Sequence, residues 1–297
     1  MSEFKKLLFI VNKYSGSGYN PEHENLIESA CKKRNIAFTL QSTSGRGNAT
    51  ELAKNGVGKY DAVVAIGGDG TVNEVAQGIV STPMPIGIIP NGSGNGLARH
   101  LKIPLGIHES LDALFSNRII NMDTFRINGQ LSLAVSGIGF DGHIANLFNK
   151  YHTRGFVGYA GLVLREYFRF AEFDWDLHSV NNSGHHKSFI VAIANTSQYG
   201  NNAYIAPSAS VTDGLLNISI LDKIPIHKGV HFTYQLFNKK LKKNTLFKTF
   251  TSKDMRLQTH VPVPYHIDGE PSGISDSFTI SILPGSLKMI VPSTSQP

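Results

Sequence analysis

Cysteine is nearly absent from this sequence, with a single residue, Cys31, among 297. One thiol cannot form a disulfide within the chain, and a zinc site built from several cysteines is excluded for the same reason. Both exclusions agree with a protein of a reducing compartment.

Long apolar runs are missing as well. The first one, residues 7–11, is shorter than the hydrophobic region of a secretory signal. No stretch approaches the roughly 18 apolar residues of a membrane-spanning helix. We therefore expect a soluble, cytoplasmic protein, and peripheral attachment to the inner face of a membrane stays open.

Several catalytic signatures are also lacking. No G-x-x-x-x-G-K-[ST] occurs, which excludes a Walker-A nucleotide hydrolase, and no G-x-S-x-G elbow supplies a serine nucleophile. Gly92, Gly94 and Gly96 form G-x-G-x-G rather than the dinucleotide-binding G-x-G-x-x-G. The histidines, among them His185 and His186, lack the spacing of zinc ligands.

The composition that is present describes a sizeable folded chain. It is 41% hydrophobic and 17% charged, and its length suggests about two domains. The net charge of +6 favours anionic partners such as nucleotides, nucleic acid or acidic lipid, and charge alone does not choose among them.

The first 120 or so residues alternate strand-like and helix-like segments. Short apolar runs predict strands at residues 7–11, 36–41, 61–66 and 86–89. Helices are expected after the cap Asn20-Pro21, across residues 50–55, and behind a capping box formed by residues 71–74. This alternation predicts a parallel sheet covered by helices.

The pattern changes near residue 120. Asn128-Gly129 between two apolar runs predicts a hairpin, and residues 143–170 are expected to be largely helical. Strand signals dominate afterwards, at residues 189–194, 215–221, 255–261 and 278–283. We expect this half to be a β-sandwich.

The strongest motif is Gly67-Gly68-Asp69-Gly70-Thr71, which follows an apolar strand and opens a helix. Glycines allow close approach of backbone N–H groups to a phosphate, and a helix N-terminus offers unpaired donors. The alternative is a plain glycine turn followed by an ordinary helix cap, in which Glu74 only caps the helix.

Two more glycine-rich loops end strands in the same half, at residues 11–18 and 90–96. Ligands of open α/β sheets bind at the carboxyl ends of the strands. Three such loops at one edge indicate a nucleotide held by several turns.

Four stretches together resemble the diacylglycerol kinase catalytic family, which includes bacterial lipid kinases and sphingosine and ceramide kinases. They are residues 12–16, residues 67–74 with 92–99, Ala206-Pro207 with Asp213-Gly214, and Asp268-Gly269-Glu270. The core at residues 67–71 is shared with NAD kinases, whereas the loop at residues 92–95 and the late Asp-Gly-Glu are more specific to lipid kinases.

The resemblance implies an α/β fold plus a β-sandwich, with an NAD-kinase-like ATP-binding domain at residues 1–125. A β-rich lipid-substrate domain would span residues 126–286, and a tail at residues 287–297 would return to the first domain. The implied ATP site comprises Asn12, Ser15, Gly16, Thr43, Gly67, Gly68, Asp69, Gly70, Thr71, Asn73, Glu74 and Ser93.

The resemblance also implies the chemistry. Asp69 would position magnesium-bound phosphates, Glu270 would be the general base with Asp268 beside it, and Asp123 matches a further frequent acid. A structural Mg²⁺ would be held by oxygens of Ser210, Asp213 and Leu215. Without the family pattern, Asp213-Gly214 and Asp268-Gly269 are also common turn dipeptides.

Two positions depart from the family pattern. Lys13 stands where proline is frequent, and it either contacts phosphate or lies in solvent. Gly96 stands where many bacterial members have aspartate, and the lack of a carboxylate at this position resembles sphingosine-kinase-type loops.

The expected function is therefore a lipid kinase that uses ATP and Mg²⁺. The acceptor is diacylglycerol, phosphatidylglycerol or a sphingoid-type long-chain base, met at a membrane surface. The alternatives are an NAD kinase and a catalytically inactive nucleotide- or lipid-binding protein. No nucleic-acid partner is expected, and a homodimer stays open.

A lysine-rich segment at residues 223–256 remains outside this scheme. Its lysines are Lys223, Lys228, Lys239, Lys240, Lys242, Lys243, Lys248 and Lys253, and Asp222 and Asp254 lie at its margins. Leu236, Phe237, Leu241 and Phe247 interleave with them. The segment is either a solvated helix face with a core-facing stripe or a surface that docks on anionic membrane.

Overall fold

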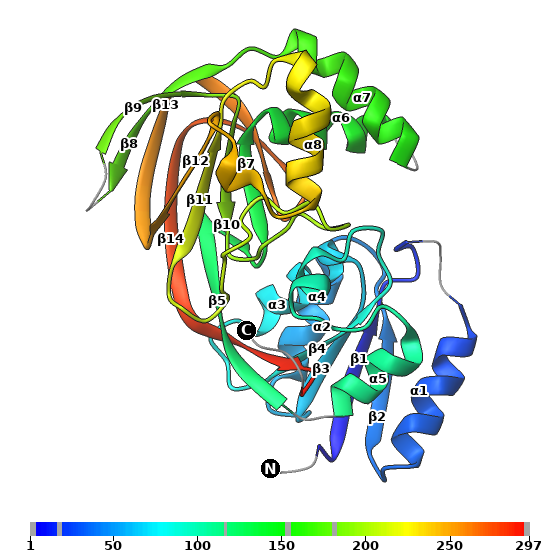
Figure 1. Ribbon diagram of the computed structural model, residues 1–297. Coiled ribbons are helices and arrows are strands. Elements are labelled where there is room, and N and C mark those ends of the chain that lie inside the picture. Colours follow the sequence, from blue (N-terminus) through cyan, green and yellow to red (C-terminus); the bar gives the residue numbers. More distant parts are fainter. Residues whose placement is uncertain (1–3, 17–19, 116–117, 152–155, 180–182, 294–297) are drawn as a thin grey trace. The chain divides into compact units, whose positions relative to one another are not determined.

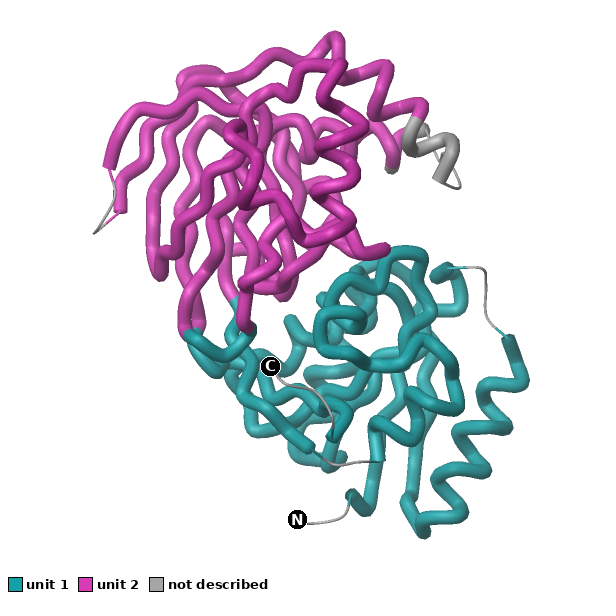
Figure 2. Tube along the Cα trace, viewed as in Figure 1, with its two compact units in different colours: residues 1–124, 211–213, 284–297 teal, residues 125–210, 214–283 magenta. Residues whose placement is uncertain are grey.

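The computed structural model describes residues 4–16, 20–115, 118–151, 156–179 and 183–293. The chain forms two compact units (Figure 2). The first comprises residues 1–124, 211–213 and 284–297, and the second comprises residues 125–210 and 214–283. The expected combination of an α/β domain with a β-rich domain is confirmed.

The first unit is a parallel sheet with helices between its strands (Figure 1). The strands lie in the order β4-β3-β1-β2. The elements are β1 (Lys6–Val11), α1 (Glu22–Lys32), β2 (Ala37–Ser42), α2 (Asn48–Gly56), β3 (Ala62–Gly67), α3 (Asp69–Ile79), β4 (Ile86–Pro90), α4 (Gly96–His100) and α5 (Ile107–Phe115). The four strands expected from the apolar runs are all present, each within one residue of its expected bounds.

Burial explains why these runs become central strands. Every residue of β3 is buried, so both faces of this strand are covered, as a parallel sheet requires. Phe9, Val64 and Ile66 belong to a core that also includes Ile27 and Leu111 from the helices. The last strand of the chain adds to this sheet at the edge formed by β4, because Met289 of β14 (Glu270–Val291) pairs in parallel with Ile86.

Two expected helix caps have different outcomes. The Asn20 side chain accepts a 3.0 Å hydrogen bond from the Glu22 N–H, as a cap of α1 should. The prediction of a capping box at residues 71–74 is wrong, because α3 begins at Asp69 and Thr71 lies within its first turn. The Glu74 carboxylate instead accepts the Gly47 N–H at 2.9 Å, just before α2.

The second unit is built on antiparallel strands in the order β12-β11-β10-β7-β13-β14, and β13 also pairs with the hairpin β8–β9. Its elements are the end of β5 (Arg118–Ile127), β6 (Gln130–Ser132), β7 (Val135–Gly139), α6 (Phe140–Tyr151), α7 (Phe156–Arg169), β8 (Phe173–Ser179), β9 (Ser183–Ser188), β10 (Ile190–Ala194), β11 (Leu216–Leu221), η1 (Ile226–Lys228), α8 (Gly229–Phe237), η2 (Leu241–Lys243), β12 (Phe247–Ser252), β13 (Asp254–Ile267) and most of β14. The predicted hairpin is confirmed, with Asn128 and Gly129 at φ of 49° and 82°.

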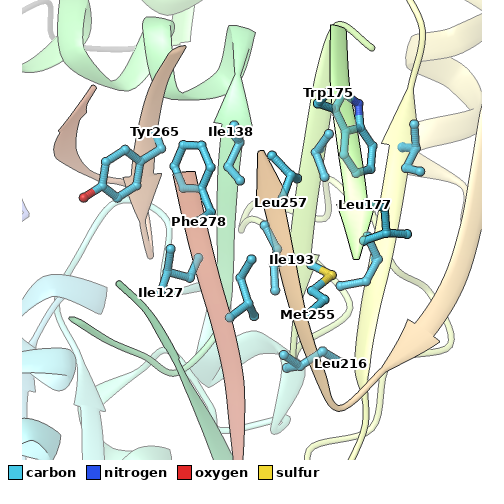
Figure 3. Packing of buried hydrophobic residues seen from close by; sticks show 14 of the residues in the cluster. Ile127, Ile138, Trp175, Leu177, Ile193, Leu216, Met255, Leu257, Tyr265 and Phe278 are labelled. Carbon is cyan, nitrogen blue, oxygen red and sulfur yellow. The ribbon is translucent and has the colours of Figure 1, made fainter. Parts of the chain in front are cut away.

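A large apolar core lies between the strands of this unit. Trp175, Leu257 and Phe278 are almost fully buried in it (Figure 3). The indole N–H of Trp175 donates a 2.9 Å hydrogen bond to Ser188, so the one polar atom of this side chain is satisfied. In the part of the chain described here, no helix has the length and apolar character needed to cross a membrane.

Candidate functional site

Three loops of the first unit meet where β1, β3 and β4 end. The backbone N–H of Asn12, just after β1, donates to Ile66 of β3 at 3.0 Å, and the Asn91 N–H, just after β4, donates to Gly67 at 2.8 Å. The parallel sheet therefore delivers the three glycine loops to one edge, as the sequence predicted.

The first loop, which follows β1, is hydrogen-bonded to α3, the helix after the second loop. The Asn12 side-chain amide donates to Thr71 Oγ1 at 3.1 Å. Its oxygen accepts the Tyr14 N–H, while the Ser15 hydroxyl donates to the Asn12 carbonyl at 2.9 Å. Asn12 thus shapes its own loop and joins it to α3. Lys13 is exposed and forms a long ion pair with Glu24 at 3.9 Å.

The loops approach one another so closely that glycine is required. A Cβ on Gly16 would lie 2.3 Å from the Asn91 carbonyl oxygen, and a Cβ on Gly92 would lie 2.4 Å from the Gly68 Cα. Gly16 also has a φ of +62°, which L side chains rarely adopt. These contacts explain Gly16 and Gly92 by packing between loops.

A hollow of about 380 Å³ opens between the first and third of these loops. Of the candidate ATP-site residues, Gly16 and Ser93 line it directly. The remaining lining residues were not among the predicted binding residues; they are Pro90, Asn91, Gly92, Asn95, Arg99 and Leu105. Arg99 supplies a guanidinium to the lining, and its Nε–H donates to the Gly94 carbonyl at 3.0 Å. The signal for it was the position of an arginine just after the G-x-G-x-G loop.

Asp69 connects the second loop to the third. Its carboxylate accepts the backbone N–H groups of Gly96 and Leu97, at 3.1 and 3.3 Å, at the start of α4. A carboxylate is favoured there by the helix N-terminus. Asn95, in a left-handed conformation, adds a reciprocal pair of hydrogen bonds with the Gly92 backbone.

The other candidate nucleotide residues lie around this centre. Thr43 follows β2, and its N–H donates to the Val11 carbonyl at 2.9 Å. Asn73 is buried on α3 and accepts a hydrogen bond from Gln77. Gly70 and Thr71 occupy the first turn of α3, where helix N–H groups lack partners within the helix.

The donor chemistry of this edge fits a nucleoside triphosphate. It combines the N-terminus of α3 and closely packed glycine loops with a hollow that the Ser93 hydroxyl and the Arg99 guanidinium line. Such a set binds anionic phosphate through backbone donors and a cation. Carboxylate oxygen from Asp69 is the ligand type that Mg²⁺ prefers, although here it is already engaged with α4.

The second unit holds the two late carboxylates on one turn. Asp268 and Gly269 have φ of 49° and 87° and join β13 to β14, with Ile267 opposite Glu270. The interpretation of Asp268-Gly269 as a turn dipeptide is therefore confirmed. The Asp268 carboxylate accepts hydrogen bonds from the Ser132 hydroxyl and from two backbone N–H groups, of Leu133 and Ala134, at 2.7–2.9 Å. Glu270 is exposed directly beside this anchored turn.

A buried polar side chain that was not predicted from the sequence, His266, supports the same turn. His266 is 3% exposed, its Nδ1 accepts the Gly269 N–H at 3.0 Å, and its Nε2 lies 3.4 Å from Asp141. Asp141 also accepts a 2.9 Å hydrogen bond from the Tyr199 hydroxyl. These three residues are far apart in sequence, so no local motif marks them.

The residues expected to hold a structural cation lie on one loop. Ser210 and Leu215 are half-buried members of the second unit, whereas Asp213 is exposed and belongs to the segment that joins the first unit. Their hydroxyl, carboxylate and carbonyl oxygens suit a hard cation. In the first unit, the carbonyl of Val211 accepts the Asp123 N–H, and the buried Asp123 carboxylate accepts the Gly285 N–H. Asp123 therefore anchors chain segments within this unit.

Comparison with known proteins adds independent information. Residues 6–127 match the family described as the diacylglycerol kinase catalytic domain, and residues 134–291 match the YegS C-terminal NAD kinase beta sandwich-like domain. Proteins named "Probable lipid kinase YegS-like" from Yersinia pestis (strain Pestoides F) and Yersinia pseudotuberculosis serotype O:1b (strain IP 31758) are 26% identical, with 96% of both chains covered. A crystal structure of a diacylglycerol kinase from Bacillus anthracis str. Sterne superposes with a TM-score of 0.79 at 22% identity, over 100% of both chains, which shows a shared fold.

Proposed function

Because the chain belongs to the family that joins a diacylglycerol kinase catalytic domain to a YegS C-terminal domain, we propose that it transfers the γ-phosphoryl group of ATP to a lipid hydroxyl. One structural observation carries the proposal. Three glycine loops lie against one another at the carboxyl ends of β1, β3 and β4, and the first and third of them line a hollow together with Arg99.

In this proposal the first unit binds ATP. The N-terminus of α3 and the loop at Gly92 and Ser93 hold the phosphates, with Arg99 as a nearby cation. Asp69 fixes the relation between these two loops through α4. When bound, Mg²⁺ neutralises charge on the transferring phosphates. Ser210, Asp213 and Leu215 are the proposed ligands of a second, structural Mg²⁺.

The second unit is proposed to serve the acceptor. Glu270 is exposed and follows a turn fixed by Asp268 and His266, so its backbone position is well defined. Its carboxylate is the proposed general base that accepts the proton of the attacking lipid hydroxyl. Asp268 is instead a positioning residue, because its oxygens are occupied by Ser132, Leu133 and Ala134.

The acceptor class follows from the family and not from the geometry of the loops. Diacylglycerol, phosphatidylglycerol and a long-chain base are the proposed candidates, and Gly96 favours the last. The enzyme would work in the cytoplasm and meet its lipid at the inner face of a membrane.

The decisive experiment offers labelled ATP and Mg²⁺ with a total lipid extract from the source cell, or with NAD. Transfer of label to a lipid, identified by mass, is the expected result. Label on NAD alone would make the protein an NAD kinase, and tight ATP binding without transfer to any lipid would make it an inactive binding protein. A Gly92→Val protein is the matched control for contaminating kinases, since its side chain would collide with Gly68.

A further inference from the structure

Positive charge is concentrated in one segment of the second unit. Residues 223–253 contain eight lysines and no aspartate or glutamate. Because the whole chain has a net charge of +6, the remaining residues carry a net charge of −2. The basic character of the protein therefore resides in this segment, which contains η1, α8, η2 and β12.

Helix α8, in the middle of this segment, is apolar on two opposite faces. Its inner face places Phe232 and Leu236 against a core that includes Leu241 and Phe247. Its outer face exposes Val230, Tyr234 and Phe237, with exposed fractions of 85%, 49% and 39%, at the i, i+4, i+7 spacing of one helical stripe. Ile226 of η1 extends the stripe and is 55% exposed.

Lysines lie at both ends of this stripe. Lys228 immediately precedes α8, and Lys239, Lys240, Lys242 and Lys243 follow this helix, all exposed. The Lys240 ammonium donates to the Tyr234 hydroxyl at 2.9 Å and lies 5.0 Å from the centre of its ring. Lys239 lies over the Tyr204 ring at 4.5 Å. Positive charge thus directly borders exposed apolar surface.

We propose that this docking surface, formed by Ile226, Val230, Tyr234 and Phe237 with the five neighbouring lysines, binds an anionic lipid bilayer. An apolar helix stripe edged by lysines is the pattern of a helix that lies in a membrane interface. Lysines near an anionic leaflet add electrostatic attraction, which salt screens. The inference rests on the proposed function, because it supplies the means by which the enzyme reaches a membrane-embedded acceptor.

Vesicle co-sedimentation tests the docking surface without any need for catalysis. Wild-type protein should bind vesicles that contain phosphatidylglycerol far better than pure phosphatidylcholine vesicles at low salt. Replacing Lys239, Lys240, Lys242 and Lys243 by glutamine should weaken that binding by at least about tenfold. The matched control replaces four exposed lysines of the first unit, Lys5, Lys33, Lys54 and Lys59, and should bind as wild type. Val230→Asn with Phe237→Asn should weaken binding even where charge is intact.

Other outcomes separate the possibilities. Equal binding to neutral and anionic vesicles, or equal losses in the two lysine variants, would overturn the proposal. Binding to a DNA duplex but not to vesicles would assign the surface to nucleic acid and overturn it too. If the protein phosphorylates no lipid yet binds anionic vesicles through these residues, the proposed function fails and the docking surface stands. Activity on lipid dispersed in neutral detergent should be unchanged in the lysine variant.

A separate side-chain group lies on the exposed face of strands β8, β9 and β13. Asp176 of β8 is paired in register with His185 of β9, and its carboxylate oxygens lie 3.1 Å from His185 Nδ1 and 2.9 Å from His260 Nε2 of β13. One donor atom from each residue lies within 4.8 Å of the others. Imidazole nitrogen with carboxylate oxygen is a donor set that suits Zn²⁺ and related ions.

Asp174 lies beside the second ring nitrogen of His185. Its carboxylate lies 3.5 Å from Nε2 of His185, the ring nitrogen that points away from Asp176. A carboxylate on the far nitrogen orients a metal-binding histidine and raises its basicity. The sequence did not reveal the group, because Asp176 and His260 are 84 residues apart and only strand pairing brings them together.

We infer that Asp176, His185 and His260 form a transition-metal site, with Asp174 as the residue that positions His185. Titration of untagged protein with Zn²⁺ in a calorimeter should show one saturable site, and Co²⁺ should give its visible absorption bands. His260→Gln and Asp176→Asn should each weaken binding by at least about tenfold. His178→Gln, an exposed histidine on the same strand, is the matched control. Absence of saturable heat, or equal binding by His260→Gln and wild type, would overturn the inference.

Discussion

The carboxylate of Asp69 accepts the backbone N–H of Gly96 at 3.1 Å. Through this bond the residue that opens α3 also fixes the start of α4. The backbone N–H of Gly96 is the donor, so this hydrogen bond needs no side chain at position 96.

The Asp69 bond predicts the behaviour of Asp69→Ala. Loss of a helix-capping carboxylate typically costs about 0.5–2 kcal/mol, so the free energy of unfolding should fall by that amount. ATP affinity should fall as well, because the loop at Gly92–Gly96 loses its anchor. Denaturant unfolding and ATP titration calorimetry measure the two effects. A protein that unfolds earlier but binds ATP normally would show that Asp69 has no role in the nucleotide site.

Gly16 and Gly47 form a matched pair of left-handed glycines. Both have positive φ, but a Cβ on Gly16 would lie 2.3 Å from Asn91, whereas nothing lies within 4 Å of a Cβ on Gly47. Gly16→Ala should therefore lower ATP affinity at least about tenfold, or about 1.4 kcal/mol. Gly47→Ala should lose only the small stability expected from left-handed strain. Equal ATP affinity in the two variants would contradict the packing explanation of the first loop.

Asp268 should be important for stability. Asp268→Ala removes a charged acceptor of three hydrogen bonds and should lower the free energy of unfolding by about 2–3 kcal/mol. Asp268→Asn should be milder, because asparagine retains an acceptor and tolerates the left-handed turn. Chemical denaturation of both proteins gives the comparison, and an Asp268→Ala protein as stable as wild type would reject the anchoring role.

Replacing Glu270 tests the proposed general-base step. If it is the general base, Glu270→Gln should lower turnover by about 100- to 10,000-fold, with ATP binding and stability near wild type. A loose transition state would place the loss at the low end of that range. The control is Asp276→Asn, an exposed acid of the same strand. Turnover of Glu270→Gln within a few-fold of this control would remove Glu270 from the mechanism.

Burial raises the pKa of the Cys31 thiol from 9.0 to about 11. The pKa of this thiol is higher in the folded protein than in the unfolded chain. The contribution of the buried neutral thiol to the free energy of unfolding is therefore fully present below pH 9 and is lost as the pH rises toward 11. At pH 8 the native thiol should resist iodoacetamide, and one equivalent should react after unfolding. Rapid labelling of the folded protein, measured by mass, would contradict the buried position.

The sequence predicted the strands of the first unit well because each is a short, uniformly apolar run with a buried place in a parallel sheet. It failed at residues 71–74, where Glu74 has the correct spacing for a local cap but bonds to Gly47 from another helix. Local patterns contain no information about such a partner.

The candidate site shows the same limit. The glycine loops were found because their residue types are unusual, and their meeting at one edge followed from the parallel topology. The role of His266 was not found, because it depends on contacts that no spacing rule describes. Arg99 was missed although it stands just after the third glycine loop. The proposed ATP, metal and base residues remain predictions that the experiments above address.

The pairing of Met289 with Ile86 also bears on how the protein is made. About 200 residues separate the two strands, and a ribosome adding about 5–20 residues per second needs some 10–40 seconds to synthesise them. Throughout that interval the edge of β4 has no β14 beside it. The nascent chain therefore carries an open strand edge until translation is almost complete, and this interval is when protection by a chaperone would have the greatest effect.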